Sequence, residues 1–151
     1  MLNPVQIRPA IVSEQKDLEA LQRRASLNNA GDREALLANP DAIQLPLEQI
    51  AANRVFLAER DGAIVGFFAV LPREDGETEL DALFVEPNLW RQGVGKLLIE
   101  HCADVARAQG SAQLHVVGNP HAKEFYTACG FQVTGTVRTR FGLGLALIKK
   151  L

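Results

Sequence analysis

The stretch over residues 79–98, ELDALFVEPNLWRQGVGKLL, constrains the fold most, because an apolar strand pattern passes through a glycine-bearing loop into a helical pattern. Leu80 and residues 83–85 form a nearly continuous apolar run, which predicts a central strand covered on both faces. Beyond the loop, apolar residues recur every three or four positions as far as Gly110, which predicts an amphipathic helix. The predicted stripe on this helix consists of Val94, Leu97, Leu98, His101, Cys102, Val105 and Ala106.

The loop between strand and helix, residues 91–96, reads RQGVGK. Gly93 and Gly95 carry no Cβ, so a ligand can approach the main chain closely. The first N–H groups of the following helix lack intrahelical acceptors, and with the helix dipole they favour a phosphate or pyrophosphate. Arg91 and Lys96 add positive charge. A tight strand-to-helix turn without a ligand explains the same glycines, so the loop by itself leaves both interpretations open.

Turn residues and apolar periods divide the rest of the chain. Asp61-Gly62 is a strong two-residue turn signal, so residues 54–60 and 63–71 are expected to form a hairpin, with Gly66 at a bulge or close approach. Asn119-Pro120 predicts a helix start and Gly130 its end. Also predicted are a strand at 5–8, a helix capped by Ser13 and ending near Gly31, a helix capped by Asp32 and running to Ala38, a strand at 113–117, and a hairpin of 131–137 and 143–147; residues 41–53 are unassigned.

The loop is followed by a second motif, NPHAKEFYTACGF, at residues 119–131. Together with ELDALFVEP and NLWRQGVGKLL it resembles the GNAT superfamily of acyl-CoA-dependent N-acyltransferases, over essentially the whole chain. Gly93 and Gly95 match the family loop Q/R-x-x-G-x-G/A, whereas Trp90 stands at the Q/R position and Arg91 one place later. The resemblance implies one domain over residues 1–151 with an α/β (α+β) fold, in which about four helices flank a mixed, mostly antiparallel sheet of six to seven strands.

The resemblance also implies acetyl-CoA as the acyl donor, with no metal. Residues 91–96 (Arg91, Gln92, Gly93, Val94, Gly95 and Lys96) would hold the pyrophosphate. The pantetheine would lie along the backbone of Leu83, Phe84 and Val85, because free strand edges pair with its amides. Asn119 matches a polar family position that meets the cofactor, and it is equally explained as a simple N-cap.

Transfer to an amine needs a base, because a lysine-like amine with a pKa of about 10.4 is almost fully protonated at neutral pH. Glu79 and Asp81 are two residues apart on the predicted strand, so they are expected on one face of the sheet. Either carboxylate, or water, is a candidate base. The resemblance assigns Tyr126 as the general acid for the leaving thiolate, although an aromatic residue on an apolar helix face is also a typical core residue.

Composition limits the other possibilities. A length of 151 residues suffices for one domain with a full core, and a net charge of −2 argues against nucleic acid or an anionic membrane as partner. Two cysteines give neither a disulfide framework nor metal-ligand spacing. The absence of a long apolar run and of a signal-peptide pattern predicts a cytoplasmic protein without membrane association.

The acceptor stays open at this stage, and a small-molecule amine or a peptide or protein amine would serve. Asn29, Arg33 and Glu48 are possible acceptor contacts because the region between the first two strands helps form the acceptor pocket in the family. Arg138 and Arg140 could attract an anionic acceptor or only solubilise a turn. A homodimer is possible. A non-catalytic acyl-CoA sensor and an interaction module are the alternative functions.

Overall fold

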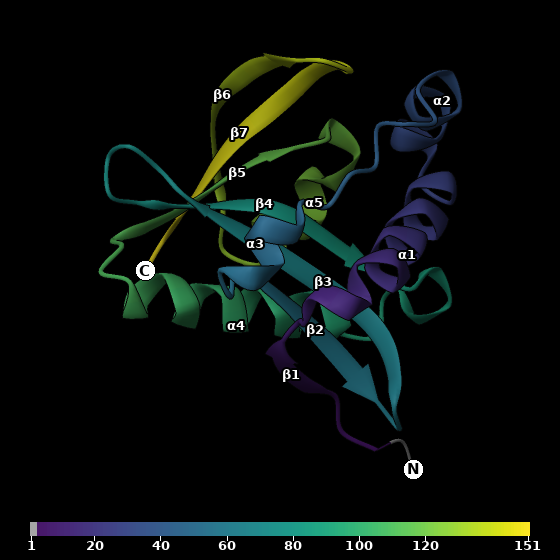
Figure 1. Cartoon of the computed structure of the whole chain (residues 1–151). Coiled ribbons are helices and arrows are strands. Elements are labelled where there is room, and N and C mark those ends of the chain that lie inside the picture. The colour runs from purple at the N-terminus through teal and green to yellow at the C-terminus, as the bar shows by residue number, and fades with distance from the viewer. Residues whose placement is uncertain (1–2) are drawn as a thin grey trace.

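The computed structural model of the chain describes residues 3–151, which form a seven-stranded sheet in the order β1-β2-β3-β4-β5-β7-β6 with helices on both faces (Figure 1). Only β4 and β5 are parallel neighbours. The predicted mixed, mostly antiparallel sheet is therefore confirmed, with five α-helices in the described residues. The strands are β1 (Gln6–Pro9), β2 (Val55–Arg60), β3 (Ala63–Pro72), β4 (Thr78–Val85), β5 (Gln113–Gly118), β6 (Gln132–Thr139) and β7 (Gly142–Lys150); the α-helices are α1 (Gln15–Leu27), α2 (Ala30–Ala38), α3 (Leu47–Ala51), α4 (Val94–Ala108) and α5 (Lys123–Ala128).

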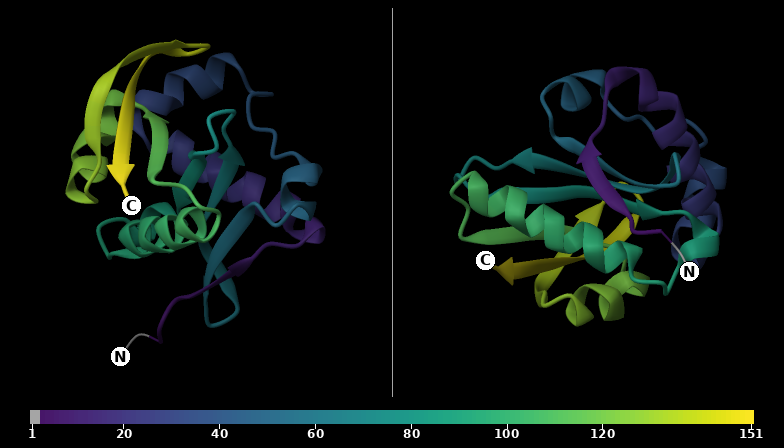
Figure 2. Two further views of the ribbon diagram at one scale, coloured as in Figure 1. Left: turned by 90° about the vertical axis from the view of Figure 1, so that its left-hand side faces the viewer. Right: turned by 90° about the horizontal axis from the view of Figure 1, so that it is seen from below.

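Two hydrophobic cores lie on opposite faces of the sheet. One forms beneath α4, where Leu98 and Cys102 pack against strand residues such as Leu114. The other forms beneath α1 and α3. Figure 2 (right) shows α4 running across one face, with α1 on the far side of the sheet. The central strands are thus covered on both faces, which is why β3 and residues 82–85 of β4 are nearly continuous apolar runs.

The first helical region differs from its prediction. Ser13 lies in a 3-10 turn, Val12–Glu14, instead of capping the helix, because the Glu14 carboxylate accepts from the Ile11 N–H at 2.9 Å and closes this turn first. Helix α1 then ends at Leu27, short of the predicted end near Gly31. Asn29, not Asp32, caps α2, since its side chain accepts from the Gly31 N–H at 3.0 Å.

Helix α4 begins at Val94 and stops before Gly110, as predicted. Its buried stripe is rotated from the predicted one. Leu97 is 38% exposed, whereas Ile99 and Ala103 are buried. Leu97 had fitted the three- and four-residue period equally well, so periodicity alone left the edge of the stripe undetermined. No helix within residues 3–151 combines the length and the apolar character needed to span a membrane.

The β2–β3 hairpin is confirmed. Asp61 and Gly62 both have positive φ, 53° and 80°, as a type I′ turn requires. The bulge lies at Val65, which is the unpaired residue between the pairs Ala58↔Gly66 and Glu59↔Ile64. Gly66 serves the close approach, because a Cβ there would lie 3.0 Å from the Phe84 carbonyl oxygen.

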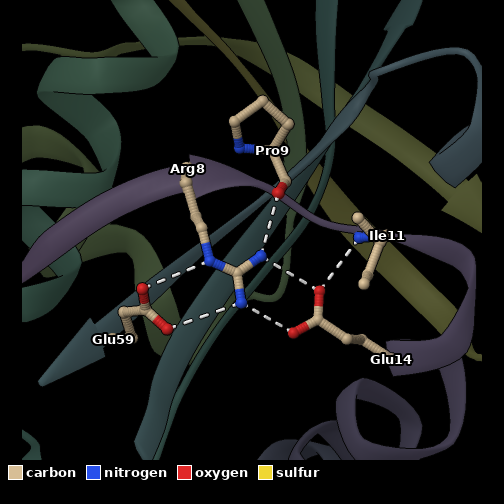
Figure 3. Close-up of polar contacts among 5 residues, drawn as sticks. All are labelled: Arg8, Pro9, Ile11, Glu14 and Glu59. Atoms are coloured by element: carbon tan, nitrogen blue, oxygen red, sulfur yellow. Dashed lines mark hydrogen bonds and ion pairs between the residues drawn. The ribbon is translucent and has the colours of Figure 1, made fainter. Parts of the chain in front are cut away.

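An ion-pair cluster fastens the N-terminal elements to the sheet (Figure 3). Arg8 of β1 binds Glu59 of β2 at 3.2 Å and Glu14, just before α1, at 2.8 Å. The hydrogen bond from Arg8 lowers the pKa of Glu14. Each carboxylate of the cluster therefore has a charged partner, and the cluster joins β1, β2 and the start of α1.

Candidate active site

The sheet opens between β4 and β5. These strands pair only at Thr78↔Leu114, Glu79↔His115 and Leu80↔Val116. At this point β4 carries a bulge, because Ala69 pairs with Ala82 while the next residue, Val70, pairs with Leu80, so Asp81 is unpaired. A bulge bends its strand and increases the local twist, which carries residues 82–85 away from β5. The later part of β4 therefore has a neighbour on the β3 side only.

The open edge of β4 presents main-chain groups at Leu83 and Val85. The Glu86 N–H donates to the Val65 carbonyl of β3 at 2.9 Å. Since alternate residues direct their N–H and C=O groups to opposite sides, Phe84 bonds toward β3, and Leu83 and Val85 point into the opening. The indole N–H of Trp90 donates to the Val85 carbonyl at 2.9 Å and occupies that acceptor. Both groups of Leu83 and the N–H of Val85 remain for a ligand.

A cavity of about 500 Å³ occupies this opening. The separated stretches of β4 and β5 form its floor. Trp90, Arg91 and Gly95, from the glycine-bearing loop and its flanks, also line the cavity. Tyr126 and Asn119 line it from the C-terminal side. The two motifs that stood out in the sequence therefore meet at one cavity.

The loop leaves a row of main-chain donors unused. Gly93 is the N-cap of α4, in the left-handed region at φ 87°, and supplies no side-chain cap. The first bond at this end runs from the Leu97 N–H to the Gly93 carbonyl at 3.1 Å. Among the described residues, the N–H groups at 94–96 hydrogen-bond to no protein acceptor. An anion placed here would meet these donors and the positive end of the helix.

Not every loop residue faces the cavity. Arg91 and Gly95 line it, whereas Gln92, Gly93, Val94 and Lys96 do not, and Val94 is buried in the core beneath α4. Gly95 also has a packing role, because a Cβ there would lie 2.9 Å from the Phe125 ring.

Tyr126 is held firmly at the cavity wall. Its ring packs edge-to-face against Phe125 and Phe131, with centroids 5.2 and 5.4 Å apart. It also lies against Gly118, where a Cβ would be 3.0 Å from the ring. Burial is the main reason that the pKa of the Tyr126 hydroxyl is raised. The hydroxyl donates to no protein group within residues 3–151, and it keeps its proton at neutral pH.

The two candidate bases are placed differently. Asp81 lines the cavity, and the Gln49 side-chain amide lies 3.4 Å from its carboxylate. Glu79 pairs with Leu71 and His115 in the closed part of the sheet and does not line the cavity. The bulge explains the difference, because it interrupts the strand period between the two residues.

Asn119 joins two parts of the site. Its side-chain oxygen accepts from the His121 N–H at 2.9 Å, so Asn119 is an N-cap, but of the 3-10 turn Pro120–Ala122; α5 begins only at Lys123, later than predicted. Its side-chain amide donates to Asp32 of α2 at 2.9 Å. Gly31 permits this approach, because a Cβ there would collide with His121 and Asn119. Asp32 was considered in the sequence only as a helix cap, and no local spacing signals a contact across 87 residues.

A second cavity of about 330 Å³ adjoins the first between α2 and the β6–β7 hairpin. Figure 2 (left) shows the tip of this hairpin beside α2. Of the possible acceptor contacts, Asn29 lines the larger cavity, while Arg33 and Glu48 line neither, nor do Arg138 and Arg140. The residues common to both cavities are Asp32, Phe84, Val117, Gly118 and Asn119.

The chain is thus an α/β domain whose sheet opens beside a helix N-terminus with free N–H groups, an arrangement that favours an extended, phosphate-bearing ligand. The acetyltransferase (GNAT) family matches residues 19–131, and the chain belongs to this family. Peptidyl-lysine N-acetyltransferase YjaB of Salmonella typhimurium is 41% identical over 56 residues, 37% of each chain. The uncharacterized N-acetyltransferase Rv2669 of Mycobacterium tuberculosis is 28% identical over 91 residues.

These curated relatives are matched over 37% and 58% of their own lengths. Among solved structures, the PaiA N-acetyltransferase of Thermoplasma acidophilum in complex with coenzyme A superposes with a TM-score of 0.79. It is 17% identical, with 99% of this chain and 100% of that chain covered. The ribosomal-protein-S18-alanine N-acetyltransferase of Escherichia coli gives a TM-score of 0.70 at 21% identity, with 97% and 94% covered. At these identities the likeness shows the fold.

Proposed function

We propose that the chain acts as one N-acetyltransferase domain that moves an acetyl group from acetyl-CoA to a primary amine. The opening between β4 and β5 carries this proposal, because it runs from the free N–H groups of the 91–96 loop to the Tyr126 wall. Family membership and the coenzyme A in the PaiA structure support the choice of donor.

The donor would be held mainly by main-chain groups. Its pyrophosphate would bind the N–H groups of residues 91–96, with added charge from Arg91 and Lys96. Its pantetheine amides would pair with Leu83 and Val85, beside the Phe84 side chain. Asn119 would line the same channel, although both of its polar side-chain atoms already have protein partners. Main-chain recognition explains why Trp90 can replace the usual Gln or Arg.

The transfer would proceed by direct attack. A neutral amine nitrogen forms a bond to the thioester carbon, and the carbon–sulfur bond breaks with its electron pair on sulfur. Tyr126 gives its proton to this thiolate and regains one from solvent. The proton lost by the amine goes to Asp81 or to water. Of the two carboxylates, Asp81 is favoured because it lines the cavity and Glu79 does not.

Thiol release from acetyl-CoA, measured with a panel of amines and peptides beside calorimetric titration with CoA, tests the proposal. We expect CoA binding and amine-dependent release of thiol. Binding without turnover for every acceptor would favour the acyl-CoA sensor instead. Failure to bind CoA would overturn the assignment of the loop.

A further inference from the structure

We propose that the acceptor is a small primary amine with an apolar or aromatic body and no acidic group, and that Asp32 binds its ammonium. This inference rests on the proposed function and names the substrate class of the same site. It comes from the smaller cavity. Asp32 and Asn119 are among the five residues that this cavity shares with the larger one, which is called the donor channel below.

The described residues that line this cavity carry negative charge only. Asp32 is the only ionisable side chain among the described residues that line it, and the polar remainder, such as Gln22 and Ser26, is uncharged. A carboxylate or phosphate on the acceptor would meet no cation among the described lining residues and would face the Asp32 charge. Arg140 stacks over the Phe141 ring, 5.0 Å from its centroid, but does not line the cavity. An amine would find an opposite charge. The lining therefore selects a cation and rejects an acidic acceptor.

Asp32 is oriented for this role. Asn119 donates to its Oδ1 at 2.9 Å, and no protein group within residues 3–151 donates to its Oδ2. Asp32 lines both cavities, so an ammonium bound to the free oxygen would lie at their junction. The nitrogen would thus be held beside the channel that delivers the thioester. Asp32 contacts the acceptor in this arrangement. One ammonium proton leaves to Asp81 or water before the neutral nitrogen attacks, and the second leaves to Asp81 or water after the new bond forms.

Apolar side chains line two sides of this cavity. Leu36 and Ile43 line the helical side, and Phe141 and Leu143 line the hairpin side. Phe141 and Leu143 are 50% and 61% exposed, and with Leu36 and Ile43 they line one cavity, where they offer a contiguous apolar surface to a ligand. A volume of about 330 Å³ is at the small end of ligand pockets, which favours a small molecule over a peptide segment.

Phenethylamine and L-phenylalanine provide a matched test, because they differ only in the carboxylate. Each is titrated calorimetrically into the CoA-saturated protein and assayed for acetyl transfer. We expect phenethylamine to bind at least about tenfold more tightly and to react with a correspondingly higher kcat/KM. Nα-acetyl-lysine amide, whose side-chain amine is free, is assayed in parallel. It represents a peptidyl-lysine acceptor and should be the poorer substrate.

Two substitutions separate recognition from general damage. Asp32→Asn should weaken phenethylamine binding about 10- to 100-fold, since it removes the charged partner. Asp104→Asn, at an exposed carboxylate on α4, is its control and should change nothing. Leu143→Arg adds a cation to the lining and should reverse the preference toward phenylalanine. Leu37→Arg, at an equally exposed position on α2 that lines neither cavity, should not.

Donor binding is followed separately through the single tryptophan, Trp90, which lines the donor channel. If the wild type fails to bind CoA, the proposed function fails and the acceptor class fails with it. With CoA bound, the acceptor class alone is overturned by equal or tighter binding of phenylalanine, by a preference for the lysine amide, by binding of no amine, or by an Asp32→Asn protein that binds phenethylamine normally.

Discussion

The two edges of β4 differ, and the difference locates the site. Toward β3 the strand is paired at both ends, from Thr78↔Pro72 to Val85↔Gly66, and interrupted only by the bulge at Asp81. Toward β5 it is paired over three residues and then free. The paired edge belongs to the part of the sheet in which Arg8 neutralises its carboxylate neighbours. The free edge faces Asp81, Asp32 and Tyr126, each with a polar atom left for a ligand.

The comparison teaches that unsatisfied groups gather where strand pairing stops. A strand edge left open inside a domain exposes main-chain donors and acceptors at a cost, unless a ligand pairs with them. Variants on the two sides should therefore behave differently. Those on the open side should reduce turnover, and those on the closed side should reduce stability with little effect on chemistry.

The largest effect on the open side is expected for Tyr126→Phe. Loss of the proton donor should lower kcat by roughly 10² to 10⁴, while CoA binding stays within about twofold. The fold should persist because the ring contacts with Phe125 and Phe131 remain. Wild-type activity should also show no loss from tyrosine ionisation up to about pH 10, since burial raises the pKa of Tyr126 above its ordinary value. An unchanged kcat would remove Tyr126 from the mechanism.

A smaller effect should separate the two carboxylates of β4. Asp81→Asn should lower kcat/KM at neutral pH by roughly 10², because the cavity loses its base. Glu79→Gln, in the paired part of the strand, should change it less than about threefold and serves as the matched control. The deficit of Asp81→Asn should shrink as the pH approaches the amine pKa of about 10.4. Equal rates for both variants would indicate that water accepts the proton.

Two glycines offer a direct comparison of the edges. Gly66→Ala would place a Cβ 3.0 Å from the Phe84 carbonyl in the paired region, and Gly118→Ala would place one 3.0 Å from the Tyr126 ring. Each should lower the free energy of unfolding by about 1–3 kcal/mol through overpacking. Only Gly118→Ala should also lower kcat, by about tenfold, because it displaces the general acid. Urea unfolding and turnover of the folded protein measure the two effects, and equal kcat losses would abolish the distinction.

Much of the fold follows from local patterns. The apolar run at residues 83–85, the glycine loop and the Asp61-Gly62 turn each predicted an element that the structure contains, because strand burial, helix starts and tight turns depend on residues close in sequence. The apolar period did not decide which residues form the edge of a buried stripe. On α4 it placed Leu97 inside the stripe, whereas Leu97 is exposed. The end of the first helix was also predicted too late. Both Asn29 and Asp32 are suitable N-caps for the next helix, and the structure uses the earlier one, so α1 ends before Asn29.

The site was less predictable because its geometry depends on long-range packing. The bulge at Asp81 reflects how β4 pairs with β3, and nothing in the residues around it requires an insertion there. Asp32 lines the site only because α2 packs against the turn at Asn119, whose side-chain amide donates to it. Sequence patterns indicated which residues carry the donor-side chemistry, but the residues that would choose the acceptor emerged from tertiary structure.

The smallest effect is expected on the closed side, for Glu14→Gln in the Arg8 cluster. The free energy of unfolding at pH 7 should fall by about 1 kcal/mol, since the pair is partly exposed, and turnover should be unchanged. Arg8 lowers the pKa of Glu14 in the folded state, so this stabilisation is present above the ordinary glutamate pKa of about 4.3. It is lost as the pH falls through the lowered pKa. Urea unfolding of both proteins at pH 7 and in acid should therefore show a difference that vanishes in acid, and a difference that persisted there would mean that Glu14 stabilises the fold by packing instead of by its charge.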